Sequence, residues 1–156
     1  MNFLIFILFV SNIVFANVSG DLNMTSNNTL DATTFLEKNK SQEGVHVLDS
    51  GLQYKIEVAG SGKTPKATDE VTVMYEGKLV NGTVFDSSYV RGAPATFRVD
   101  QVIKGWQEAL QKMKEGDIWV LYIPSSLAYG ERGVAGVIPP NSTLIFKVEL
   151  QKVSSN

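Results

Sequence analysis

Past residue 50 the chain alternates apolar and polar positions with the period of two that is typical of β-strands. In residues 52–58 the apolar positions 52, 54, 56 and 58 alternate with Gln53, Lys55 and Glu57, which predicts a strand with the second set on a solvent-facing side. Residues 71–79 predict a second strand, and Asn81-Gly82 after it is a strong hairpin signal because both residues tolerate positive φ. The return strand begins at residue 83. This part of the chain therefore predicts neighbouring antiparallel strands.

The second half of the chain adds a helix and the remaining strands. Residues 95–99 predict a short strand, and residues 105–114 have helical periodicity. Residues 117–123 are apolar on both faces, which suits a central strand, and residues 143–153 predict a last strand. The apolar side of the helix consists of Trp106, Ala109, Leu110 and Met113. A single helix among sequence-adjacent strands predicts an α+β domain, with an antiparallel sheet and one amphipathic helix across its face.

The N-terminal part has a different character. Residues 1–16 carry no charge and are apolar over 3–10, which is too short for a bilayer span and predicts a secretory signal peptide cleaved after Ala16. The alternatives are an uncleaved N-terminal anchor and a mispredicted start of the chain. Residues 17–47 are predicted to form a polar linker, of which residues 17–30 should be mobile. A short helix follows in this linker, with Thr34 as its N-cap and Glu37 completing the capping box. The folded domain is expected over 48–156.

Composition excludes several classes of function. The 156 residues are 44% hydrophobic and 10% aromatic, enough for one domain with a real core. The net charge of −2 without basic runs argues against nucleic acid as a partner. The absence of cysteine and the single His46 leave no thiolate nucleophile, no metal site and no histidine triad, so no cofactor is expected. The Gly60–Thr64 stretch is not a phosphate loop, because Glu57 stands where the first glycine belongs.

The remaining candidate chemistry is aromatic. Trp106 stands at the start of the predicted helix, and inward-facing rings from the strands could surround it as the walls of a proline-sized pocket. Each choice has a plainer alternative. Trp106 could be ordinary core, the phenylalanines could fill that core, and Asp86, which precedes two serines, could only form a turn.

From about residue 48 to residue 153 the chain resembles the FKBP-type peptidyl-prolyl cis-trans isomerases, and within them the macrophage infectivity potentiator (Mip)-like branch of exported enzymes. The motifs that carry the resemblance are Ser50-Gly51-Leu52-Gln53-Tyr54, Val73-x-Tyr75-x-Gly77, Gly82-Thr83-Val84-Phe85-Asp86-Ser87-Ser88, Val102-Ile103-x-Gly105-Trp106-x-Glu108-Ala109-Leu110, Ile123-Pro124, Ala128-Tyr129-Gly130 and Pro140-Asn141-x-Thr143-Leu144-x-Phe146. The resemblance implies a half-barrel sheet wrapped around one short helix.

The resemblance also implies roles for individual residues. Trp106 would be the floor of the pocket, the Ile103 N–H and the Tyr129 hydroxyl would hold substrate carbonyls, and Asp86 would lie at the rim, paired with Arg91. The full substrate pocket implied in this way comprises Tyr75, Phe85, Phe97, Val102, Ile103, Trp106, Tyr129, Ile138 and Phe146. The expected activity is rotation of X–Pro bonds in exported proteins, and the alternative is a non-catalytic FKBP-fold peptide-binding module or chaperone.

Two positions depart from the small cytoplasmic members of the family. Ala95 stands where they often carry Phe, and Val134 where they often carry His. Both would lie at the mouth of the pocket, so we expect its chemistry to be kept and leave open the substrate preference and the inhibition by tacrolimus or rapamycin. Mip proteins place a dimerising segment and a long helix before the isomerase domain. Only about 30 residues separate Ala16 from Leu48 here, so we expect a monomer, periplasmic or secreted and not membrane-bound after signal removal.

Overall fold

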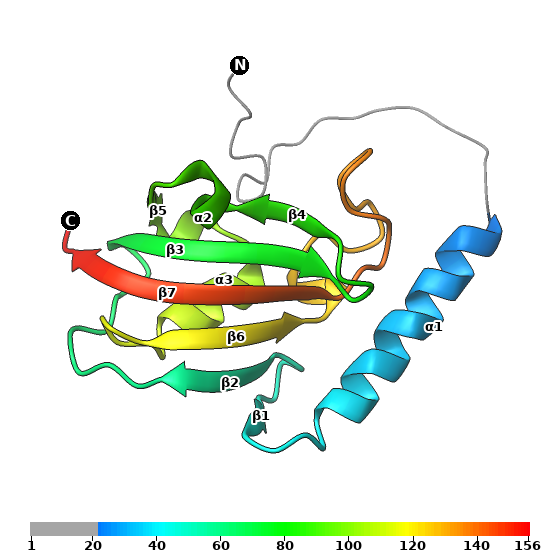
Figure 1. Ribbon diagram of the computed structural model, residues 1–156, viewed down its shortest axis with the longest axis horizontal. Coiled ribbons are helices and arrows are strands. Elements are labelled where there is room, and N and C mark those ends of the chain that lie inside the picture. Colours follow the sequence, from blue (N-terminus) through cyan, green and yellow to red (C-terminus); the bar gives the residue numbers. More distant parts are fainter. Residues whose placement is uncertain (1–21) are drawn as a thin grey trace.

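A seven-stranded antiparallel sheet organises residues 22–156, the part of the chain that the computed structural model describes (Figure 1). The predicted signal peptide and the first residues of the predicted linker lie outside the described residues. In spatial order the strands are β1 (Val45–Val47), β2 (Gln53–Val58), β6 (Ile118–Ile123), β7 (Leu144–Ser154), β3 (Glu70–Leu79) and β4 (Val84–Ser87), and β5 (Ala95–Arg98) also pairs with β3. The antiparallel sheet confirms the predicted fold class.

The long strands β3 and β7 form the middle of the sheet, and their alternate residues build the core. Val71, Val73 and Tyr75 of β3 are fully buried, as are Leu144 and Phe146 of β7. β6 lies between β2 and β7, which confirms its predicted central position. The predicted hairpin turn is also present, with Gly82 at φ +91° and the Leu79 N–H bonded to the Thr83 carbonyl.

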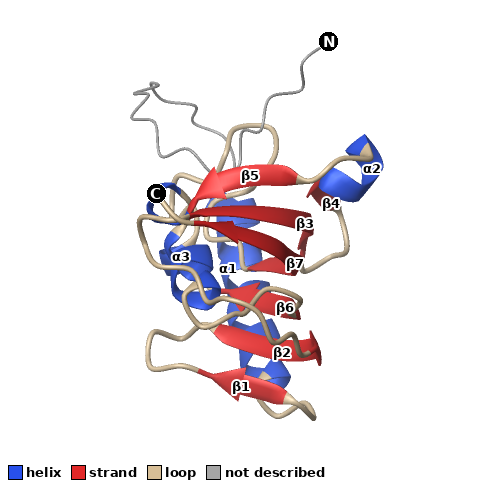
Figure 2. Cartoon of the chain, turned by 90° about the vertical axis from the view of Figure 1, so that its left-hand side faces the viewer, coloured by secondary structure: helices blue, strands red, loops and turns tan. Residues whose placement is uncertain are grey.

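The helix α3 (Lys104–Leu110) lies on one side of the sheet (Figure 2). It is shorter than the predicted 105–114. After Leu110 the chain continues in turns, although Met113 is still buried. The other short helical segments are α2 (Ser88–Arg91), η1 (Val99–Gln101) and η2 (Ser125–Leu127).

The predicted one-sided pattern of β2 is only partly correct. Gln53 is buried, whereas Ile56 and Val58 are 43% and 48% exposed. The cause is the position of β2 near the sheet edge, where β1 pairs only with residues 53–55. The apolar residues beyond that point have little structure beside them, while Gln53 is covered by an additional helix.

That helix is α1 (Leu22–Asn39), which is longer than the predicted short helix and begins earlier. Thr34 lies in its interior, so the prediction that Thr34 caps it was wrong, and residues 22–30, assigned to a mobile linker, are helical. Ala32 and Asn39 are buried and Phe35 is half-buried, at the spacing of one helix face.

The contacts of α1 place it on the face of the sheet opposite α3. The Phe35 and Tyr122 rings have centroids 6.0 Å apart, and the Asn39 amide donates to Gln53 Oε1 at 2.8 Å. Tyr122 and Ile123 are successive residues of β6, so their side chains point to opposite faces of the sheet. The Ile123 side chain is the one that packs against Gly105 of α3. Among residues 22–156, no helix combines the length and apolar character needed to cross a bilayer.

Candidate active site

Trp106 lies at the centre of a cluster of aromatic rings. Its ring meets Tyr75 and Phe146 edge to face, each with centroids 5.3 Å apart, and Phe97 at 6.0 Å and 89°. Phe85 completes the set by standing edge to face on Phe146, at 5.5 Å and 81°. Such pairs contribute about 0.5–1.5 kcal/mol each beyond the burial of their area. We call these five residues the aromatic cluster.

Two glycines allow the rings to approach each other this closely. A Cβ on Gly105 would lie 2.6 Å from Ile123 Cγ2, so this glycine lets the start of α3 rest on β6. A Cβ on Gly77 would lie 2.5 Å from Phe146 Cε1 and 2.6 Å from Phe85 Cζ. Gly77 therefore leaves the space in which these two rings meet.

A polar triangle borders the aromatic cluster. The Tyr75 hydroxyl donates to Asp86 Oδ2, and Arg91 Nη1 pairs with Asp86 Oδ1. Arg91 Nη2 also donates to the Tyr75 hydroxyl at 2.9 Å, and the guanidinium lies 5.7 Å from the centre of the Tyr75 ring. Asp86 keeps only 9% of its side chain exposed. The triangle thus fixes a carboxylate beside the cluster, with both of its oxygens occupied.

Burial and the triangle together set the protonation of Tyr75. Burial raises the pKa of the Tyr75 phenol well above its ordinary value, and the hydrogen bond to Asp86 raises it further, against an opposing effect of Arg91. Tyr75 is therefore a neutral donor throughout the physiological range.

Tyr129 lies in the long loop between β6 and β7, which folds back on itself through the Val134–Ile138 bridge and the bond from the Asn141 N–H to the Gly130 carbonyl. The Tyr129 hydroxyl is buried and has no hydrogen-bond partner among the described residues. Burial raises the pKa of this phenol, and the Asp86 carboxylate adds to the effect. A buried hydroxyl without a partner is costly, so a bound group that accepts its hydrogen bond would stabilise the site.

The remaining predicted residues lie in the same region. Val102 and Ile103 are 2% exposed, and Ile138 from the long loop is 3% exposed. Ile103 stands at the N-cap of α3, so its own N–H has no partner within the helix. Apart from Asp86 and Arg91, the predicted site residues all belong to one hydrophobic core cluster or pack against it.

Trp106 itself has no solvent exposure. The sequence left open whether it is core or the floor of a pocket, and both descriptions fit its position. A ligand reaches its ring only after neighbouring side chains shift. Among the aromatic and aliphatic members of the site, Phe85, Phe97 and Tyr129 remain partly exposed.

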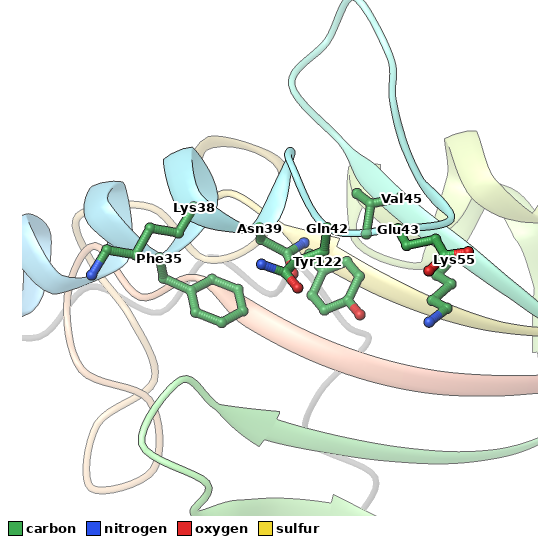
Figure 3. A pocket seen from close by; sticks show the side chains of 8 residues that line it. All are labelled: Phe35, Lys38, Asn39, Gln42, Glu43, Val45, Lys55 and Tyr122. Atoms are coloured by element: carbon green, nitrogen blue, oxygen red, sulfur yellow. The ribbon is translucent and has the colours of Figure 1, made fainter.

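An open hollow of ≈ 480 Å³ lies elsewhere, between α1 and the sheet (Figure 3). The rings of Phe35 and Tyr122 lie in this hollow, and Lys38 and Lys55 come from its two ends. None of the predicted site residues lines it. Within residues 22–156 no three histidine, aspartate or glutamate side chains come together as a metal ion would require.

Comparison with known proteins assigns the family. Residues 61–151 match the model of the FKBP-type peptidyl-prolyl cis-trans isomerases. The chain belongs to this family. In this FKBP-family chain, residues 18–56 also match the domain amino terminal to FKBP-type peptidyl-prolyl isomerase, so α1, β1 and most of β2 correspond to a recognised N-terminal element.

Curated relatives point to the Mip-like branch. The chain is 60% identical to "Peptidyl-prolyl cis-trans isomerase Mip" of Coxiella burnetii over 126 residues, 81% of this chain and 55% of the relative. It is 55% identical to "Outer membrane protein MIP" of Legionella longbeachae, covering 81% and 54%. The chain thus spans about half the length of the curated relatives it matches.

Solved structures agree with the FKBP fold. FkpA from Escherichia coli superposes with a TM-score of 0.81 at 45% identity, covering 84% of this chain and 61% of that one. A peptidyl-prolyl cis-trans isomerase from Pseudomonas syringae gives 0.80 at 38% identity, covering 87% and 100%.

Sequence reasoning gave no role to three residues that shape the site, Gly77, Gly105 and Ser88. The glycines carried a usable signal, because glycine inside a strand or at a helix start often marks a close approach. Ser88 carried none, since its bond partners lie 13 residues away along the chain.

Proposed function

We propose that this FKBP-family chain catalyses the cis–trans isomerisation of X–Pro peptide bonds in polypeptides. The observation that carries the proposal is the intact aromatic cluster around Trp106, bordered by the Tyr75–Asp86–Arg91 triangle. The cluster offers flat apolar surfaces to a proline ring, and the unpartnered Tyr129 hydroxyl offers a donor to a peptide carbonyl.

The reaction requires only that the site stabilises the twisted transition state more than the planar ground state. Rotation about an X–Pro bond meets a barrier of about 20 kcal/mol because the planar amide is stabilised by resonance. That planar form has the more charge-separated carbonyl and nitrogen, and the twisted transition state loses this polarity. A dry aromatic surface therefore disfavours the planar state relative to the twisted one. Four decades of rate require about 5.5 kcal/mol of such selectivity, and no bond to the substrate need form.

Residue roles follow from this requirement. Trp106, Tyr75, Phe97, Val102, Ile138 and Phe146 would surround the proline ring. Phe85 and Asp86 would face the reacting bond, with Arg91 holding the carboxylate in place. The Ile103 N–H and the Tyr129 hydroxyl would hold the flanking carbonyls so that one side of the bond turns against the other. Because Trp106 is covered, we further propose that substrate binding displaces partly exposed rim side chains such as Phe85.

The setting of this activity is also a proposal. The uncharged apolar residues 1–16 support export and action on proline-containing chains in the periplasm or outside the cell. The name of the Legionella longbeachae relative, an outer membrane protein, is consistent with that setting. N-terminal sequencing of the protein recovered after expression with its own leader tests cleavage after Ala16.

Two finer features go with this function. We propose that the protein is a monomer, which sedimentation of the processed chain tests. We also propose that tacrolimus and rapamycin compete with substrate for the aromatic cluster. Ala95 and Val134 would set their affinity, which titration of the isomerase activity measures.

The deciding experiment is a protease-coupled assay with a Leu-Pro peptide. We expect the wild-type chain to accelerate isomerisation, and Phe85→Ala and Tyr129→Phe to reduce kcat/KM at least tenfold, the effect of about 1.4 kcal/mol. Tyr122→Phe is the matched control, since this half-buried tyrosine lies on the α1 side of the sheet. No acceleration, or acceleration insensitive to both site variants, would leave a non-catalytic peptide-binding module.

A further inference from the structure

The outer edge of β3 has a gap beside the aromatic cluster. β4 pairs with β3 up to Glu76 opposite Ser87, and β5 pairs with it from Glu70 up to Val73 opposite Ala95. Pro94, which precedes β5, has no N–H and cannot extend that ladder. Tyr75 therefore lies where neither strand reaches this side of β3.

The side chain of Ser88 fills this gap. Continuing the β4 register by one residue would place Ser88 opposite Tyr75, but the chain has already turned into α2 there. The Tyr75 N–H donates to Ser88 Oγ at 2.8 Å, and Ser88 Oγ lies 3.2 Å from the Tyr75 carbonyl oxygen. One hydroxyl thus satisfies both main-chain groups that a strand would otherwise have paired.

The hydroxyl has one proton and two possible acceptors. The Tyr75 carbonyl oxygen lies at 3.2 Å and the Met74 sulfur at 3.6 Å. A thioether is the weaker acceptor, so the proton goes to the carbonyl. Ser88 has no solvent exposure, so water cannot replace its hydroxyl without a rearrangement of the segment.

Both ends of Tyr75 are consequently held by the same segment. The phenol bonds Asp86 and Arg91, while the main chain bonds Ser88, which lies between them in sequence. Asp86 and Ser88 flank Ser87, whose own hydroxyl accepts from the Val90 N–H and caps α2. Movement of the main chain at Tyr75 therefore changes the geometry of the whole triangle.

We propose that Ser88 is a positioning residue of the isomerase site, because its hydroxyl fixes the main chain of Tyr75 against the segment that carries Asp86 and Arg91. The proposal rests on the proposed isomerase function. Its physical content is specific: the hydrogen-bonding capacity of the side chain matters more than its volume. That distinction separates positioning from simple packing of a buried residue.

Three substitutions at this position test the proposal. Ser88→Ala removes the hydroxyl, Ser88→Cys keeps a similar volume with a weak donor and acceptor, and Ser88→Thr keeps the hydroxyl but adds a methyl group. For the fraction of protein that is folded, we expect kcat/KM to fall roughly fivefold to tenfold in the Ala and Cys variants. The Thr variant should retain clearly more activity than Cys. The reverse order, with Cys near wild type and Thr the worst, is what packing alone predicts and would overturn the proposal.

Two further measurements keep the test decisive. Val153→Ala removes buried apolar volume at the end of β7, and it should lower stability while leaving kcat/KM unchanged. The ring signals of ¹³C-labelled Tyr75, assigned with Tyr75→Phe, should shift in Ser88→Ala and stay near wild type in Ser88→Thr. Unchanged ring signals in Ser88→Ala would contradict the positioning role. If the wild-type chain failed to accelerate isomerisation, the proposed function would fall, and the Tyr75 signals alone would still decide whether Ser88 positions this side chain.

Discussion

Gly77 of β3 and Phe146 of β7 lie directly opposite each other in the central strand pair of the sheet. A Cβ added to Gly77 would lie 2.5 Å from Cε1 of the Phe146 ring. The Phe85 ring occupies the other side of the same space, 2.6 Å from that carbon position. Phe146 is fully buried, so it has little room to yield, whereas Phe85 is partly exposed and can move outward, away from the cluster.

Gly77→Ala should therefore damage the site more than the fold. We expect a cost of about 1–3 kcal/mol in the free energy of unfolding from overpacking. We also expect a loss of at least tenfold in kcat/KM, the equivalent of about 1.4 kcal/mol, because Phe85 is displaced. Chemical denaturation and the Leu-Pro peptide assay measure the two effects.

Gly82→Ala is the matched control for that substitution. Gly82 has φ +91° with no atom near its Cβ position, so alanine there introduces strain without touching a ring. Stability should fall while activity remains. Equal activity losses in the two variants would mean that the space at Gly77 has no special connection with the site.

Trp106→Ala should affect both stability and activity. The cavity should cost about 3–5 kcal/mol, and turnover should fall because the three rings packed on Trp106 lose their common support. Trp106→Leu should spare more stability than activity. Trp119→Leu, which replaces the other buried tryptophan, stacked on Tyr54 at 4.3 Å, should lower stability with little effect on kcat/KM. If Trp106→Leu lost stability and activity in the same proportion as Trp119→Leu, Trp106 would be ordinary core.

The sequence predicted the antiparallel sheet and the residues around Trp106 because both depend on strong local signals. Strand alternation directs Tyr75 and Phe146 to one face, and Asn81-Gly82 specifies the hairpin turn. The beginning of α1 was missed because residues 22–30 are rich in residues that favour turns. Once residues 32–39 dock on the sheet, extending the helix backwards adds a hydrogen bond per residue without a new nucleation cost.

Other misses came from contacts that join distant parts of the chain. Gln53 was assigned to the wet side of β2 because nothing in its neighbourhood reveals that α1 covers it. The bond from Tyr75 to Ser88 depends on where two strands stop pairing, which is a property of the sheet and not of the Asp-Ser-Ser sequence. Such features follow from topology, so a local pattern cannot predict them.

Asn39→Ala should loosen α1 without altering the isomerase site. The substitution leaves buried Gln53 Oε1 without the amide that donates to it at 2.8 Å, at a cost of about 1–3 kcal/mol. Hydrogen exchange of residues 36–40 should accelerate, while kcat/KM stays at the wild-type value because α1 lies on the face opposite α3. The double variant Asn39→Leu with Gln53→Met removes both polar partners and should recover part of the protection. Faster exchange throughout β3 and β7 would instead indicate that α1 is integral to the core.

Asp86→Asn should lower activity without changing the shape of the pH profile. Protonation of the substrate carbonyl would strengthen the double-bond character that hinders rotation, so Asp86 is assigned to orientation and electrostatic support rather than to proton transfer. Between about pH 6 and 8 we expect kcat/KM to be flat in the wild type and uniformly lower in the variant. A bell-shaped wild-type profile that disappears in Asp86→Asn would contradict this assignment.

Alkaline conditions should destabilise the fold through Tyr75 and Tyr129. Burial raises the pKa of both phenols above the ordinary value of 10.0. A folded-state pKa above the unfolded one means that the folded protein holds the proton more tightly. The resulting stability is fully present below about pH 10 and is lost as the pH rises from there towards the folded-state pKa. Urea unfolding between pH 8 and 11 should show the free energy of unfolding falling above pH 10, less steeply in Tyr75→Phe with Tyr129→Phe than in the wild type. An identical slope in that double variant would show that the alkaline loss comes from other groups.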